Sequence, residues 1–200
     1  LSQHEERYPN FVTIKLDCKN AHNSVVRSRT LKALIESPCS ALRELARPFW
    51  ATMSPASAVN GIDRKSERGV QQGDGIAGPA FAAAIHPHIT TAAGILEPIN
   101  GIILACSDDV YLRAPANVAF PAALALRDSL LDDLGLELQV SKSTVFTRDV
   151  GALRTVLDAN PDWGGVPDPG TGVRTGGFAI GTCDNVDGWS ASFGDGFGLT

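Results

Sequence analysis

Residues 11–17, Phe-Val-Thr-Ile-Lys-Leu-Asp, decide the fold. Polar and apolar side chains alternate through residues 11–16, which is the period of a β-strand with one buried face. Asp17 follows on the face of Thr13 and Lys15, away from the apolar side chains. The sequence therefore predicts a strand that ends in a carboxylate.

A second group of acids follows a predicted hairpin. Residues 101–106 are a short apolar run, which predicts a buried strand, and residues 110–112 turn back as a second strand after Asp108 and Asp109. If these strands are neighbours of the first, Asp17, Asp108 and Asp109 meet at one sheet edge. Carboxylate oxygens from separate strands suit a pair of magnesium ions. The alternative is that Asp108 and Asp109 form a simple polar turn.

The remaining periodicity predicts helices at residues 23–36, 42–50, 76–96 and 116–134, with a hairpin within residues 56–68. Beyond residue 150 the chain is rich in glycine, proline and aspartate, with a strand-like stretch near 177–181. This order predicts an α+β fold in which a small antiparallel sheet has helices packed on one face.

Composition sets the broad class. The 200 residues are 44% hydrophobic and 20% charged, which is typical of a globular protein. No apolar run approaches the roughly 18 residues of a membrane span, and no signal peptide opens the chain. We therefore expect an intracellular protein, nuclear or cytoplasmic. The chain begins with Leu1 and its only methionine is Met53, so we expect a piece of a longer protein.

Charge and cysteines exclude few functions. The net charge of −5 argues mildly against a nucleic-acid partner, but residues 1–68 hold 11 of the 17 basic residues and 7 of the 22 acidic ones. This basic front and acidic rear are compatible with a nucleic-acid enzyme. None of the four cysteines is spaced as a Cys-x-x-Cys metal or redox site.

Several segments resemble the palm motifs of non-LTR retrotransposon reverse transcriptases. Residues 17–25, Asp-Cys-Lys-Asn-Ala-His-Asn-Ser-Val, are similar to the first motif, which usually reads Asp-Phe-Lys-Asn-Ala-Phe-Asn-Ser-Val. Residues 68–74, Arg-Gly-Val-Gln-Gln-Gly-Asp, look like the second motif, and Asp108-Asp109 like the third. Residues 135–142 resemble the fourth, and residues 177–181 the short glycine motif that follows the palm. Together the motifs stand in the family's order.

The resemblance implies a role for each matching residue. Asp17 and Asp108 would hold two Mg²⁺ ions, for which Mn²⁺ could substitute, and Asp109 would be the supporting third carboxylate. Lys142 would protonate or stabilise the leaving pyrophosphate, although a solvated loop lysine is an equally good reading. The residues expected on the nucleotide side are His22 at the sugar-screening aromatic position, Gln72 and Gly73 against the nascent base pair, and Arg68 at a phosphate.

The resemblance also implies partners and domains. An RNA-directed DNA polymerase needs an RNA template, a DNA primer, deoxynucleoside triphosphates and the fingers and thumb of the polyprotein. Residues 1–150 would be the palm without its N-terminal fingers, and residues 151–200 an irregular tail with a palm-to-thumb strand near 173–181. Two alternatives stay open, a catalytically inactive relic and a noncatalytic palm-like module that binds nucleic acid or protein.

Overall fold

The computed structural model of the chain describes residues 2–51, 56–59, 62–64, 67–70, 74–139, 142–147, 150–163, 172–175 and 178–181. The chain divides into two compact units. We call them the sheet unit, which is Leu1–Asp17, Leu96–Ala123 and Gln139–Thr200, and the helical unit, which is Cys18–Ile95 and Leu124–Leu138. This division differs from a boundary at residue 150, which stays a prediction.

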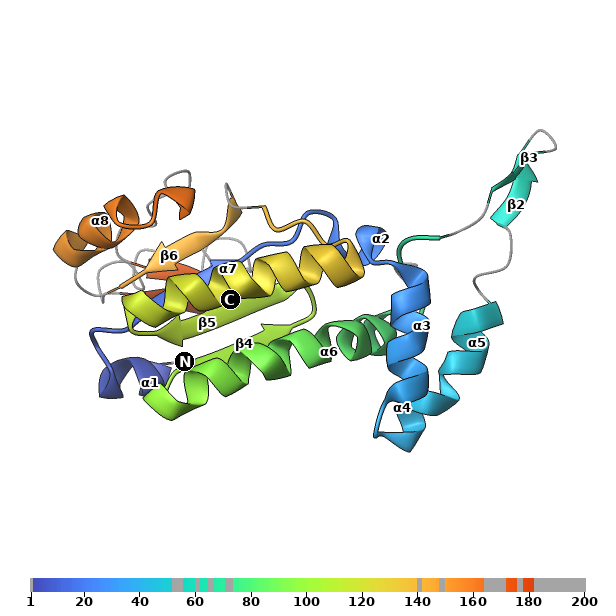
Figure 1. The fold of residues 1–200 in the computed structure, drawn as a ribbon, viewed down its shortest axis with the longest axis horizontal. Coiled ribbons are helices and arrows are strands. Elements are labelled where there is room, and N and C mark those ends of the chain that lie inside the picture. Colours follow the sequence, from blue (N-terminus) through green and yellow to red (C-terminus); the bar gives the residue numbers. More distant parts are fainter. Residues whose placement is uncertain are drawn as a thin grey trace, which may run out of the picture. The chain divides into compact units, whose positions relative to one another are not determined.

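A four-stranded antiparallel sheet forms the centre of the sheet unit (Figure 1). Its order is β4-β5-β1-β6, and the strands are β1 (Val12–Leu16), β4 (Ile102–Cys106), β5 (Asp109–Ala114) and β6 (Thr144–Phe146). The two central strands supply most of the sheet's buried side chains: Val12, Ile14, Leu16, Val110, Leu112 and Ala114. Thr13, Tyr111 and Arg113 on the opposite face are also buried, so both faces of the centre are covered.

Strand β4 corrects one prediction. The sequence predicts that its apolar run, residues 102–106, is buried. The last three of these residues are exposed, and Leu104 is 46% exposed. The physical reason is position, because β4 pairs only with β5 among the described strands and so lies at the sheet edge. Hydrophobic content alone does not distinguish an edge strand from a central one.

Other elements of the sheet unit come from both ends of the chain. They are α1 (Ser2–Arg7), η1 (Glu97–Ile99), α8 (Val150–Asp158), η3 (Pro161–Trp163) and the two-stranded sheet of β7 (Gly172–Thr175) and β8 (Phe178–Gly181). Trp163 packs edge-on against Phe120, with ring centroids 5.5 Å apart. Strand β8 falls where the strand near 177–181 was predicted, whereas the sequence reading did not predict α8.

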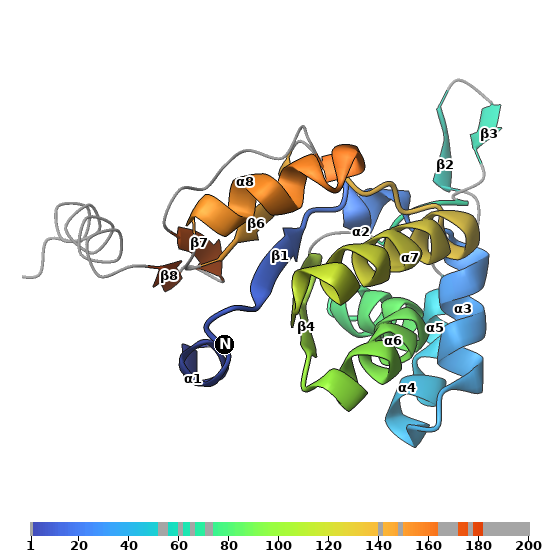
Figure 2. The ribbon, with the colours of Figure 1, turned by 60° about the vertical axis from the view of Figure 1, so that its left-hand side comes forward.

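The helical unit holds α2 (Ala21–Ser24), α3 (Arg27–Glu36), α4 (Ser40–Glu44), α5 (Ala46–Ala51), the hairpin of β2 (Ala56–Val59) and β3 (Ile62–Arg64), and nearly all of α6 (Ala77–Leu96). Figure 2 shows α3, α4 and α5 side by side. Helix α7 (Ala116–Leu134) begins in the sheet unit and ends in the helical unit.

The helix predicted at residues 23–36 is interrupted. It is α2 followed by α3, because the backbone is extended at Val25 and Val26. The Gly69 N–H donates to the Val25 carbonyl at 2.7 Å and the Arg27 N–H to the Glu67 carbonyl at 3.1 Å, so the antiparallel bridge between Val26 and Arg68 keeps this stretch extended. Helices α6 and α7 confirm the ranges predicted for them to within a residue.

The fold class is confirmed, since a small antiparallel sheet is combined with helices in an α+β arrangement. No helix in the described part of the chain is long and apolar enough to cross a bilayer.

Candidate active site at an acidic sheet edge

Asp17 lies directly after β1 and its backbone is fixed on both sides. Its N–H donates to Ser143 Oγ at 3.2 Å, and its carbonyl accepts from the Gln139 N–H at 2.7 Å. Ser143 Oγ in turn donates to the Gln139 carbonyl at 3.1 Å. The segment before β6 therefore holds Asp17 at the end of its strand.

The other two acids lie at the β4–β5 hairpin. Ser107 and Asp108 form its two-residue turn, and Ser107 takes a left-handed φ of 58°, which such tight hairpins require at a central position. Asp108 is exposed and Asp109 is half-buried. Leu16 pairs with Val110, so continuing the register by one residue puts Asp17 across from Asp109. Residues directly opposite in an antiparallel pair share a face of the sheet.

Asp109 is held by two neighbours on that face. Lys15 Nζ lies 3.0 Å from its Oδ1, and the Tyr111 hydroxyl donates to its Oδ2 at 3.0 Å. The Lys15 ammonium also lies 5.7 Å from the centroid of the Tyr111 ring. Burial alone would lower the pKa of Lys15, but the hydrogen bond and negative charge of Asp109, helped by Tyr111, hold that pKa above its ordinary value.

The carboxylates suit a divalent ion in chemical type. Mg²⁺ prefers hard oxygens and is commonly held by one or two protein carboxylates, with water and substrate phosphates completing its shell. Continuing the register would bring Asp17 and Asp109 to one face, and Asp108 stands in the turn that adjoins Asp109. In the described part of the chain, no three acidic, histidine or cysteine residues are gathered closely enough to hold a metal among themselves. Metal binding by Asp17, Asp108 and Asp109 stays a prediction.

Lys142 belongs to the same unit as the acids. It is exposed, and its backbone N–H donates to the Gln139 carbonyl at 3.0 Å. Its role at a leaving pyrophosphate also stays a prediction.

His22 lies in α2 of the helical unit and is half-buried. Its ring packs against Phe81 with centroids 4.5 Å apart and an interplanar angle of 37°. Its carbonyl accepts from the Val70 N–H at 2.6 Å. The first motif-like segment is thus bound to the second through backbone, and the His22 ring has an aromatic neighbour.

The start of the second motif-like segment packs tightly on the first. Gly69 has a φ of 81°, and a Cβ there would lie 2.8 Å from the Asn23 carbonyl oxygen, so only glycine fits. The Gly69 N–H donates to the Val25 carbonyl at 2.7 Å, and Arg27 Nη1 donates to the Gly69 carbonyl at 2.9 Å. Burial lowers the pKa of the Arg27 guanidinium, and the negative charge of Asp74 offsets part of this effect.

Arg68, the predicted phosphate contact, is exposed in the helical unit. Its guanidinium lies close to Gly135, where a Cβ would come within 3.1 Å of Nη1. Gln72 and Gly73, predicted against the nascent base pair, lie outside the described residues.

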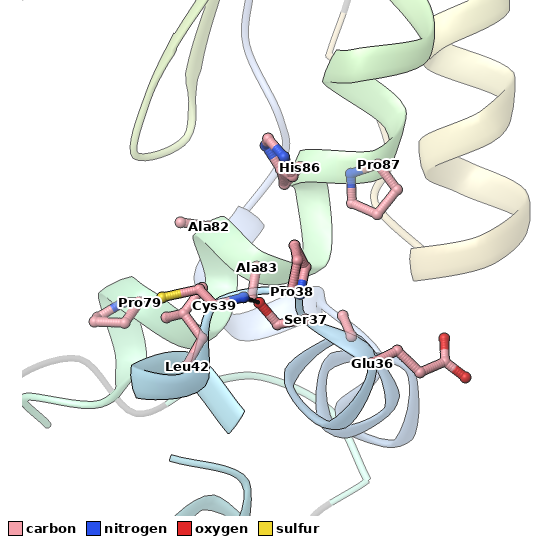
Figure 3. A pocket seen from close by; sticks show the side chains of 11 residues that line it. Glu36, Ser37, Pro38, Cys39, Leu42, Pro79, Ala82, Ala83, His86 and Pro87 are labelled. Carbon is pink, nitrogen blue, oxygen red and sulfur yellow. Dashed lines mark hydrogen bonds between the residues drawn. The ribbon is translucent and has the colours of Figure 1, made fainter. Parts of the chain in front are cut away.

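A mostly apolar pocket of about 460 Å³ lies within the helical unit (Figure 3). Cys39 and Leu42 lie beside Pro79, whereas Glu36 points away from the other lining side chains. The predicted site residues do not line it; its walls are Ala33, Glu36, Ser37, Pro38, Cys39, Leu42, Pro79, Ala82, Ala83, His86 and Pro87.

The ring of His88 lies between Ser129 and Asp133, as the histidine of a hydrolase triad lies between its serine and its aspartate. His88 Nδ1 lies 2.6 Å from Ser129 Oγ, and its Nε2 lies 3.4 Å from Asp133 Oδ2. Acyl transfer also needs N–H donors aimed at a developing oxyanion. These residues lie inside α6 and α7, where backbone N–H groups are bonded within the helix. The cluster is therefore a polar contact between two helices.

Lys15 and Tyr111 are the residues at the acidic edge to which the sequence reading gave no role. The available signal was strand alternation, which put Lys15 on the face of Asp17. The pairing of β1 with β5, which brings Lys15 to Asp109, depends on a long-range register that alternation does not give.

The sequence matches no family model and no curated protein. Among solved structures, the chain is similar to a Candida tropicalis telomerase, with a TM-score of 0.62 and 10% identity over 90% of this chain and 33% of the other. A C-terminally truncated form of that telomerase gives a TM-score of 0.58 and 10% identity over 90% of this chain and 36% of the other.

The telomerase of Candida albicans, solved with a fragment of telomeric RNA, gives 0.60 and 12% over 92% of this chain and 33% of the other. The chain thus spans about a third of the length of these structures. Telomerase is a reverse transcriptase, and at this identity the likeness shows the fold alone. The chain therefore has a reverse-transcriptase-like fold.

Proposed function

We propose that the chain is the palm of an RNA-directed DNA polymerase of the non-LTR retrotransposon type. The observation that supports the proposal is the β1–β5 register, which pairs Leu16 with Val110; continued by one residue, it would bring Asp17 across from Asp109, beside the turn that holds Asp108. This arrangement occurs on a reverse-transcriptase-like fold, at the positions where the palm motifs were recognised. The retrotransposon type rests on the wording of residues 17–25 and 68–74 alone.

The reaction follows from these residues. Asp17 and Asp108 would hold two magnesium ions, with Asp109 in support, and the ions would activate the primer 3′-hydroxyl and neutralise the leaving pyrophosphate. The chain's own part would be to hold the carboxylates in place, and the backbone hydrogen bonds of Asp17 to Ser143 and Gln139 fix the end of the strand that carries one of them. Lys142 would stabilise the pyrophosphate, and His22 and Arg68 would contact the incoming nucleotide.

The partners would be an RNA template, a DNA primer and deoxynucleoside triphosphates. One similar structure, the Candida albicans telomerase, was solved with telomeric RNA, which supports a nucleic-acid partner here. Fingers and thumb segments would supply the phosphate contacts that a chain of net charge −5 lacks.

Primer extension on an RNA template tests the proposal, with the chain joined to the fingers and thumb segments that it requires. We expect magnesium-dependent extension that Asp17→Asn and Asp108→Asn each reduce at least about a hundredfold, since both remove a metal ligand. The matched control is Asp132→Asn, an exposed acid on α7, which should extend as the parent does. Extension that survives in Asp17→Asn, or no extension by the parent protein, would contradict the proposal.

A noncatalytic palm that binds nucleic acid is the second candidate. It is favoured by the ion pair that Asp109 already makes with Lys15. In that case nucleic-acid affinity would be the same in the parent and in Asp17→Asn, and no extension would occur in either.

A further inference from the structure

Both carboxylate oxygens of Asp109 have a partner. Oδ1 faces the Lys15 ammonium at 3.0 Å, and Oδ2 accepts the Tyr111 hydroxyl at 3.0 Å. The two side chains of the ion pair are 23% and 32% exposed, so the pair is screened less than one on open surface. Lys15 therefore places a positive charge against one oxygen of a carboxylate that is assigned to the proposed metal site.

At that position, Lys15 and a metal ion would compete for the Asp109 carboxylate. A carboxylate oxygen has two lone pairs, and the ammonium at 3.0 Å occupies one of the directions from which a cation could be coordinated. A divalent ion would also be repelled by the lysine charge across a few ångströms. Tyr111 is neutral and donates to the other oxygen, so it orients Asp109 without the same repulsion.

We propose that Lys15 is an internal counter-ion, which holds Asp109 while no divalent ion is bound and competes with the ion for that carboxylate. The inference rests on the metal site proposed above. It assigns a positioning role to Lys15, which would lower the affinity of the acidic edge for metal and keep its like charges neutralised when metal is absent.

Calorimetric titration of the 200-residue chain with Mn²⁺ tests this role. Lys15→Met keeps the length of the side chain and removes its charge, and we expect it to bind Mn²⁺ roughly tenfold more tightly at low salt, the scale expected for removing a unit charge a few ångströms from a divalent ion. Lys15→Arg keeps the charge and should bind as the parent does. Lys32→Met, which removes an exposed lysine of α3, is the matched control and should leave the affinity unchanged.

A second background separates competition from a general change in the fold. In Asp109→Asn the carboxylate for which Lys15 and the ion compete is gone and only the repulsion by the lysine charge remains, so adding Lys15→Met should change the Mn²⁺ affinity by less than in the parent. A merely structural lysine would alter unfolding in both backgrounds and metal affinity in neither. Thermal unfolding in a chelator identifies any variant that fails to fold, in which case Lys15→Gln replaces Lys15→Met.

The outcomes separate this inference from the proposed function. If the parent and Lys15→Met bind Mn²⁺ equally, the counter-ion role is wrong and the metal site stands. Weaker binding by Lys15→Met would also overturn the role, since Lys15 would then assist the metal. If neither protein binds Mn²⁺, the metal site itself is wrong and the inference falls with it.

Discussion

At the scale of single residues, close backbone contacts hold both ends of the first motif-like segment, residues 17–25, in place. Asp17 is fixed by backbone hydrogen bonds in the sheet unit, and Gly69 closes on Asn23 in the helical unit. Neither of these two contacts involves a metal ion or a nucleotide. The structural role of these positions can therefore be tested by stability measurements on the chain as it is.

Gly69→Ala should destabilise the chain by about 2 kcal/mol, because φ is 81° and the new Cβ would lie 2.8 Å from the Asn23 carbonyl oxygen. The matched control is Gly94→Ala, within α6, where a Cβ meets nothing within 4 Å. It should stabilise the helix by up to about 1 kcal/mol. Denaturant unfolding measures both, and equal effects of the two substitutions would refute this reading of Gly69.

Arg113 is a second residue whose contribution to the stability of the chain can be measured. It is 1% exposed, and it donates to Thr13 Oγ1 at 2.7 Å and to the Tyr8 carbonyl at 2.6 Å. Arg113→Met should cost about 3 kcal/mol, since it leaves buried acceptors without these donors. Arg154→Met, an exposed arginine of α8, should change stability by less than about 0.5 kcal/mol. A loss at Arg113 as small as that of the control would show that the buried hydrogen bonds contribute little.

At the scale of elements, position in the sheet decides what each strand contributes. β5 has a neighbour on both sides, and its Leu112 is fully buried, whereas β4 lies at the edge with Leu104 at 46% exposure. β4 is apolar throughout and β5 contains Asp109 and Arg113, so hydrophobic content would predict the opposite burial, and the pairing of the strands decides it. Their tolerance of substitution should differ accordingly.

Leu112→Ala should lower the free energy of unfolding by about 3 kcal/mol, because it opens a cavity in a packed core. Leu104→Lys should change it by less than about 0.5 kcal/mol and reduce aggregation, since charged side chains protect an exposed edge. Thermal unfolding with light scattering measures both effects. A large loss of stability in Leu104→Lys would place β4 inside the core.

The sequence was sufficient for elements whose signal is local. Alternation in residues 11–16 predicted β1, and helical periodicity predicted α6 and α7. It failed where a long-range contact competes with local preference: Val25 and Val26 stay extended at the bridge to Arg68, and β4 becomes an edge strand. The pairing of Lys15 with Asp109 depends on such a contact too, which is why alternation alone gave Lys15 no role.

At the scale of the whole molecule, the predicted site residues divide between the two units. The acids and Lys142 belong to the sheet unit, and His22 and Arg68 belong to the helical unit. The chain also spans about a third of the telomerase structures that it resembles. A reverse-transcriptase-like fold is shown by that likeness, whereas polymerase activity is carried by the proposal for the acidic edge.

Anomalous diffraction from crystals soaked in Mn²⁺ tests whether these carboxylates hold a divalent ion. We expect a manganese peak bonded to the carboxylates of Asp17 and Asp108, with Asp109 in support and Lys15 Nζ moved away from Asp109 Oδ1. Crystals of Asp17→Asn should lack that peak, and those of Asp132→Asn should keep it. A peak elsewhere, or no peak at this edge while Lys15 stays 3.0 Å from Asp109, would contradict the account.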